Sequence, residues 1–147
     1  MAGTIIADRI EAASTSQLVI ENGVALTPPT IVDVNNVQIG TFCRAWVNFN
    51  GTGTVAIRAS FNVSSITDNS AGNYTVNFTN AMPDINYTTL ISTQGAATNS
   101  IVGEYGLYTA STTTFQAPTT SAFRITTWDS ALSGNFDTAY VMATIFR

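Results

Sequence analysis

The chain has 147 residues, of which 45% are hydrophobic and only 10% are charged, and its formal net charge is −4. A typical soluble domain has about 25% charged residues. A surface this poor in charge is weakly solvated, so we expect identical subunits or other proteins to cover part of it. The five basic residues are all Arg and are scattered along the chain, which argues against nucleic acid as a partner.

Residues 1–26 match neither a helix nor a strand pattern throughout, and the Pro28-Pro29 pair ends any regular element because proline lacks a backbone donor. We interpret residues 1–26 as an N-terminal arm, since its many Ile, Leu and Val residues disfavour a solvated tail. Residues 27–40 are expected to be a connector with one short strand at 31–34. Residues 41–147 are expected to be the folded domain.

A β-hairpin is predicted for residues 42–61. Apolar residues recur at every second position over 42–49 and again over 55–61, and the Asn-Gly-Thr-Gly segment 50–53 between them has the composition of a turn. The second of these runs places on one face Val55, Ile57, Ala59 and Phe61. The only cysteine, Cys43, lies on the apolar face of the first run, which indicates a buried thiol.

Further strands are predicted at 63–67, 74–78, 87–93, 101–110, around Phe115, 123–128 and 139–147, with a turn at 68–72. Turn signals every 8–12 residues or so are typical of a sandwich. The last strand is apolar on both faces, which predicts a central place in a sheet or at a subunit interface. The fold class that follows is all-β, an antiparallel, jelly-roll-like β-sandwich with an N-terminal arm.

Two stretches resemble a module that recurs in virion proteins of tailed bacteriophages, especially cyanophages and other marine phages. They are the opening GTIIADRI and the run AWVNFNGTGTVAIRASFNVSSITDNSAGNYTVNFTNAMPD. The similarity covers the start and middle of the chain well and the C-terminal part poorly. It implies a β-rich, homotrimeric, surface-exposed phage component. In such a protein the arm would dock to the particle, and its candidate docking residues are Ile5, Ile6, Ile10, Leu18 and Ile20.

The sequence lacks histidine and lysine. This excludes nucleophiles activated by histidine, histidine metal sites, Schiff bases and P-loops, so we expect no cofactor and no metal. Paired carboxylates could still cleave glycosides. The candidates are Asp68, Asp84, Glu104, Asp129 and Asp137. All except Glu104 lie beside Asn, Ser or Gly in expected turns, where Asp caps backbone donors, so we expect no enzyme.

Four aromatic residues are candidates for surface recognition: Trp46, Tyr105, Tyr108 and Trp128. They would stack on sugars or lie in protein interfaces. The alternative is that they pack in the core or along a trimer axis, which burial tendencies favour.

Together these features predict a non-enzymatic structural protein on the surface of a phage virion, folded in the host cytoplasm. As a capsid decoration (cement or head-fibre) protein, it would bind and brace the major capsid protein. The alternative is a tail-fibre tip that attaches to host surface glycan. A shaft or tail-attachment domain has no room beside the arm, which favours decoration. No apolar run is long enough to cross a membrane and residues 1–11 lack the basic start of a signal peptide, so we expect no membrane insertion.

Overall fold

The computed structural model describes residues 30–32, 35, 37–94, 101–105, 116–129 and 134–147. These residues form strands, turns and loops, with no helix among them. The strands are β1 (Thr30–Val32), β2 (Gln38–Thr41), β3 (Cys43–Asn50), β4 (Ala56–Phe61), β5 (Val63–Ser70), β6 (Asn73–Phe78), β7 (Thr88–Thr93), β8 (Ile101–Tyr105), β9 (Ala122–Asp129), β10 (Gly134–Asn135) and β11 (Val141–Phe146).

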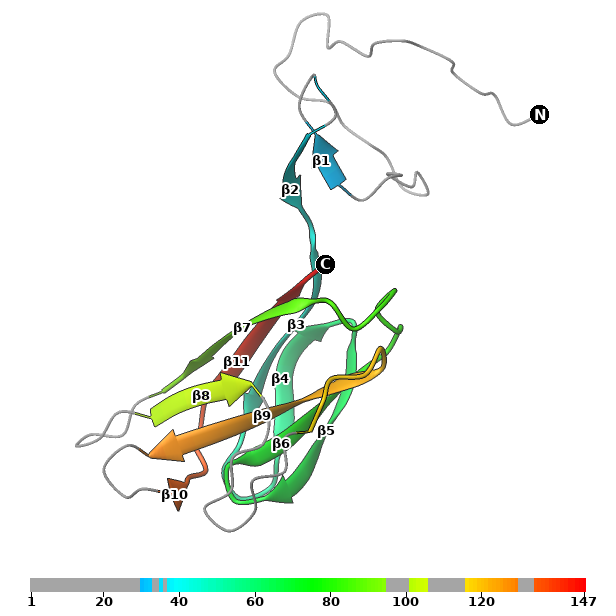
Figure 1. Ribbon diagram of the computed structural model, residues 1–147. Helices are drawn as coiled ribbons and strands as arrows, with labels where there is room; N and C mark the ends of the chain where they lie inside the picture. Colours follow the sequence, from blue (N-terminus) through cyan, green and yellow to red (C-terminus); the bar gives the residue numbers. More distant parts are fainter. Residues whose placement is uncertain (1–29, 33–34, 36, 95–100, 106–115, 130–133) are drawn as a thin grey trace, which may run out of the picture.

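Two antiparallel sheets stack face to face, and a separate hairpin of β1 and β2 stands off one end (Figure 1). The first, called sheet I here, has the strand order β4-β3-β11-β7. The second, sheet II, has the order β10-β9-β6-β5, with β8 also paired to β9. The predicted antiparallel β-sandwich is therefore confirmed.

The core lies between the two sheets, because alternate side chains of each strand point inward. The rings of Phe49 and Tyr74 bridge the sheets edge to face, with their centroids 5.1 Å apart. Further along, the rings of Phe78 and Phe123 lie 5.7 Å apart. The buried side chains of the paired strands are Ala45, Val47, Phe49, Val141, Ala143 and Ile145 from sheet I, and Val63, Tyr74, Val76, Phe78, Phe123 and Ile125 from sheet II.

Strand β11 occupies the central place that its sequence predicted, between β3 and β7. Its burial differs from the prediction. Val141, Ala143 and Ile145 are buried in the core, but Met142 on the opposite side is exposed. In the described part of the chain, this doubly apolar strand is therefore covered on one face only.

Strand β4 departs from the predicted alternation. Ala59 lies opposite Asn48 and Ile57 lies opposite Phe49, so Arg58 is an extra residue, as in a β-bulge. Because side chains alternate along a strand, one extra residue transfers everything beyond it to the other face. Ile57 packs against the core, whereas Phe61 pairs with Trp46 and is exposed on the outside.

Strand β5 is longer than predicted, since the turn expected at 68–72 is confined to Ala71 and Gly72. Asp68 remains in register, opposite Tyr74. The connector also holds more structure than the single strand expected at 31–34. Its β1 pairs with β2, and the hairpin lies near the C terminus, where the Thr41 hydroxyl donates to the carbonyl oxygen of Arg147 at 3.1 Å (Figure 1).

Candidate functional site

The outer face of sheet I presents a row of apolar side chains to solvent. Phe61, Trp46, Thr144 and Leu90 are opposite one another on the four adjacent strands, so they form one line across the sheet. The exposed fraction is 54% for Phe61, 38% for Trp46 and 66% for Leu90. Antiparallel register thus gathers on one surface residues that are widely separated in the sequence.

The next line across the same face contains Met142, paired with Asn48 on one side and Ser92 on the other. Met142 is 37% exposed. Between these lines, over β3 and β11, lies an open hollow of about 400 Å³ bounded by Trp46, Asn48, Met142 and Thr144. The side-chain oxygen of Asn48 is buried and has no hydrogen-bond partner. The face therefore has a concave part and, on β7, a protruding leucine.

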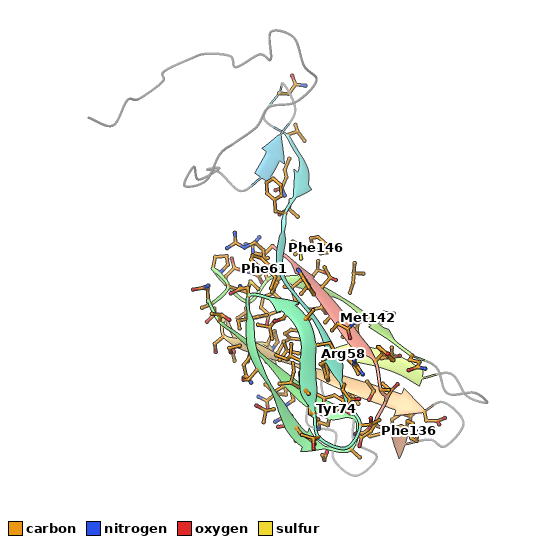
Figure 2. All side chains as sticks on the ribbon, turned by 180° about the vertical axis from the view of Figure 1, so that it is seen from behind. Arg58, Phe61, Tyr74, Phe136, Met142 and Phe146 are labelled. Atoms are coloured by element: carbon orange, nitrogen blue, oxygen red, sulfur yellow. The ribbon has the colours of Figure 1, made fainter. Side chains whose placement is uncertain are left out.

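The charge on this face is positive. The guanidinium carbon of Arg58 lies 4.1 Å from the ring centroid of Tyr140, which is the geometry of a cation–π contact. Figure 2 views the molecule from this side, with Arg58, Phe61 and Met142 labelled. The described acidic residues lie elsewhere: Asp68, Glu104 and Asp129 belong to strands of sheet II, and Asp84 and Asp137 lie outside the strands.

A second hollow of about 400 Å³ lies where the chain passes from sheet I to sheet II, lined by Phe42, Cys43, Arg44, Phe61, Asn62, Thr79, Asn80 and Ala81. Asn62 holds this corner with a φ of 55°. Its amide nitrogen lies 3.1 Å from the carbonyl oxygens of both Arg44 and Asn80, and its side-chain oxygen accepts from Asn80 N at 2.8 Å. Cys43 is half-buried beside this hollow, so the prediction of a buried thiol is only partly right.

The four aromatic candidates do not form one site. Trp46 lies on the outer face of sheet I, whereas Trp128 is half-buried on β9 of sheet II. Tyr105 ends β8, also in sheet II, opposite Ile125, and its side chain is outside the described part. Tyr108 lies outside the described residues. Among the described side chains of these four residues, Trp46 is the one that is exposed on the surface.

The candidate docking residues of the arm all lie outside the described residues: Ile5, Ile6, Ile10, Leu18 and Ile20.

The sequence did not predict that Phe61, Leu90 and Met142 are exposed on the surface. For Met142 a signal existed, since β11 is apolar on both faces. For Phe61 the bulge at Arg58 left no signal in the alternation of the strand.

For two of the candidate carboxylates, Asp84 and Asp137, the hydrogen bonds indicate a structural role. Asp84 forms a two-bond ion pair with Arg147, at 2.8 Å from Nε and 2.6 Å from Nη2. These hydrogen bonds, together with the one from the Asn86 backbone, lower the pKa of Asp84 to about 2. A carboxyl with such a pKa stays ionised near neutrality, so it is unsuited to act as a general acid.

Asp137 joins three loops at the end of the sandwich opposite the hairpin. Its Oδ1 accepts from Gly72 N at 2.6 Å and lies 2.7 Å from the Tyr74 hydroxyl, which is itself 2.8 Å from the Gly51 carbonyl oxygen. Burial and the adjacent Asp137 carboxylate raise the pKa of Tyr74 far above its ordinary value. Gly51 is required here, since a Cβ would lie 2.8 Å from the Thr138 carbonyl oxygen and 2.6 Å from the Tyr74 hydroxyl. We interpret this cluster as a structural closure of the core.

In the described part of the chain, no group of three or more His, Cys, Asp and Glu side chains is placed to hold a metal ion. The same residues include no helix that is long and apolar enough to cross a membrane. Comparison of the chain with protein-family models, curated proteins and solved structures gave no match.

Proposed function

We propose that this chain is a non-enzymatic structural protein of a bacteriophage virion, displayed on the particle surface as a homotrimeric capsid decoration protein. In this role it binds the major capsid protein and braces the shell. The sequence resemblance to phage virion proteins supports the phage assignment. The observation in the structure that carries the proposal is the apolar outer face of sheet I, because exposed patches of this kind mark contacts with other proteins.

The position of the hairpin also supports the proposal. The β1–β2 hairpin stands off one end of the sandwich, and residues 1–29 precede it (Figure 1). In our proposal those preceding residues engage the capsid while the sandwich is displayed outward. The Thr41–Arg147 hydrogen bond joins the base of the hairpin to the end of β11, and the Asp84–Arg147 pair ties that end of β11 to the loop after β6.

The test is the number of copies per particle. Quantitative mass spectrometry of purified virions, with the major capsid protein as internal standard, should give hundreds of copies. An image reconstruction should place them on the capsid. A count of a few tens or fewer, located on the tail, would overturn decoration.

Anchoring by the arm has its own test. Virions assembled with a chain lacking residues 1–26 should lose the protein, while the purified truncated chain keeps the circular dichroism spectrum of a β-sandwich. The matched control is full-length Thr67→Glu, which adds a charge to the outer face of sheet II and should still join the particle. Retention of the truncated chain on virions would show that the arm is not the anchor.

A second candidate is a tail-fibre tip that binds host surface glycan. The observation that favours it is the position of Trp46 beside Asn48 and Thr144 at the rim of the hollow, because an aromatic ring with neighbouring amide and hydroxyl groups can bind a sugar. In that case the soluble protein would block phage adsorption, and host glycan would change its tryptophan fluorescence. Neither effect is expected of a decoration protein.

A further inference from the structure

We propose that the outer face of sheet I is the contact between copies of this chain, with Leu90 of one copy seated in the hollow between Trp46 and Met142 of the next. This inference rests on the homotrimer in the proposed function, and it assigns the surface through which that trimer forms.

The first argument is the size of the surface. Phe61, Trp46, Leu90 and Met142 lie on this face, and Tyr140, which directly precedes β11, contacts Arg58 of β4 beside it. These five side chains are between 37% and 66% exposed. With side-chain areas of roughly 150–250 Å², they expose about 400–600 Å² of mostly apolar surface. A stable interface needs about 800 Å² from each partner. The polar residues between these side chains, such as Thr144 and Ser92, can supply the remainder.

The second argument is shape. The most exposed of these five side chains, Leu90, lies on β7 at one edge of sheet I, while the hollow lies over β3 and β11. A ring of identical copies requires that one part of a subunit's surface fit another part of the same subunit's surface. A protruding leucine and a hollow of about 400 Å³ on the same face meet that requirement.

The third argument is charge. The described residues place no carboxylate on this face, and its cation, Arg58, lies against the Tyr140 ring. The ring stabilises that charge when water is excluded, so the face can be buried against an uncharged surface. A copy of the same face offers mostly uncharged side chains, and its own Arg58 is again held against its own Tyr140 ring. The central strand β11 gives independent support, since its Met142 side has the apolar character of a covered face.

The experiment compares three full-length proteins by sedimentation velocity over micromolar concentrations: the wild type, Leu90→Glu and Thr67→Glu. We expect a trimer for the wild type and for Thr67→Glu, whose added charge lies on the outer face of sheet II. For Leu90→Glu we expect a monomer, with dissociation made at least about 100-fold more favourable, because a carboxylate cannot be buried in the apolar hollow. Since Leu90 is 66% exposed, the variant should fold normally, which circular dichroism will check.

Cross-linking tests the proposed pairing directly. In a Cys43→Ala background, the double variant Leu90→Cys with Asn48→Cys should form disulfides between chains and give covalent trimers on oxidation. A disulfide within one chain is excluded, because β11 lies between the two strands and about 9.6 Å of sheet separates them, beyond the roughly 7 Å limit. The single variant Leu90→Cys should give no trimers.

The outcomes separate this inference from the proposed function. A wild-type monomer at 100 µM or so overturns self-association through any face, while the copy number on virions still decides decoration. A trimer that persists in Leu90→Glu, or a double cysteine variant that does not cross-link, overturns this face but leaves the trimer standing. Dissociation of Leu90→Glu together with cross-linking of the double variant supports the inference.

Discussion

The outer faces of the two sheets differ in composition: that of sheet II is polar and hydrogen-bonded, whereas that of sheet I is mostly apolar. On sheet II, the Asn77 amide donates to Ser65 Oγ at 3.1 Å and to Thr67 Oγ1 at 3.0 Å, and the Asn69 amide donates to Thr75 Oγ1 at 2.9 Å. Ser65 and Thr67 of β5 lie opposite Asn77 and Thr75 of β6, and Asn69 lies at the irregularity just beyond them. Together these side chains form a ladder of hydroxyls and amides. On sheet I the corresponding surface is a line of aromatic and aliphatic side chains.

This difference locates the surface that the low charge of the chain leaves poorly solvated. Composition alone suggests that the whole surface is poorly solvated and prone to association. The ladder on sheet II hydrogen-bonds within itself and to the Arg124 guanidinium, whose Nη2 lies 3.4 Å from Asn69 Oδ1, so its polar groups have partners. Among the described residues we find no such network on the outer face of sheet I, where the Asn48 side-chain oxygen is buried without a partner. We therefore expect a partner protein to cover the outer face of sheet I, and not the outer face of sheet II.

The largest expected effect concerns the core that both faces share. Phe49 is fully buried and its ring bridges to Tyr74 in sheet II. Phe49→Ala should lower the free energy of unfolding by about 3–5 kcal/mol, the usual cost of a large cavity. In urea at fixed protein concentration, the signals of Trp46 in sheet I and Trp128 in sheet II should shift together. Separate transitions would show that the two sheets do not fold as one unit.

The next effect concerns the closure at the loop end. Tyr74→Phe removes the hydroxyl beside Asp137 and Gly51, which should cost about 1–3 kcal/mol because a buried acceptor loses its donor. The exposed Tyr140 provides the matched control, since Tyr140→Phe should change stability by less than about 0.5 kcal/mol. Equal effects of the two substitutions would contradict the role of this closure.

The same residue predicts an alkaline dependence of stability. The folded-state pKa of Tyr74 is raised above the ordinary value near 10, so the folded chain holds this proton more tightly than the unfolded chain. The contribution of Tyr74 is fully present below about pH 10 and is lost as the pH rises from there toward the folded pKa. Tyr74→Phe should weaken this alkaline loss, measured by urea unfolding between pH 8 and pH 11 or so. If the free energy of unfolding of Tyr74→Phe fell with pH as steeply as that of the wild type, the role of Tyr74 in this alkaline loss would be contradicted.

Alternation of apolar residues was sufficient to predict the strands of the sandwich, but it did not predict which apolar residues lie on the outer surface. Strands β3, β6, β9 and β11 follow directly from alternating apolar residues, because one buried face imposes that period. The pattern failed at the bulge in β4, since a single extra residue at Arg58 is set by pairing with β3 and has no local signal. Phe61 was therefore assigned to the wrong face.

The candidate surface depends on register between strands distant in sequence. Trp46 was identified from its own strand, but its alignment with Leu90 through Thr144 requires the pairing of β11 with both β3 and β7. Such long-range pairing cannot be derived from the periods of single strands. The apolar outer side of β11 was the one local sign of a covered face.

Two asparagines give a matched comparison of the faces. Asn77→Ala removes two side-chain hydrogen bonds on sheet II and should cost about 0.5–1 kcal/mol. Asn48→Val on sheet I removes a buried oxygen without a partner and should leave the stability unchanged or slightly raised. Both substitutions should be measured by urea unfolding in the Leu90→Glu background, so that association does not contribute. A larger loss for Asn48→Val would mean that its amide is satisfied within one chain.

The smallest effect is expected at the ion pair of Asp84 and Arg147, which belongs to neither face. Both side chains are more than a third exposed, so water and salt screen the pair and Asp84→Asn should change stability little. Because the folded-state pKa of Asp84 is lowered to about 2, its small contribution is present above the ordinary value near 3.8 and is lost as the pH falls through about 2. Sedimentation of Asp84→Asn should show the same oligomer as the wild type at low and high salt. Dissociation of this variant would extend the contact between copies beyond sheet I to the end that carries the hairpin.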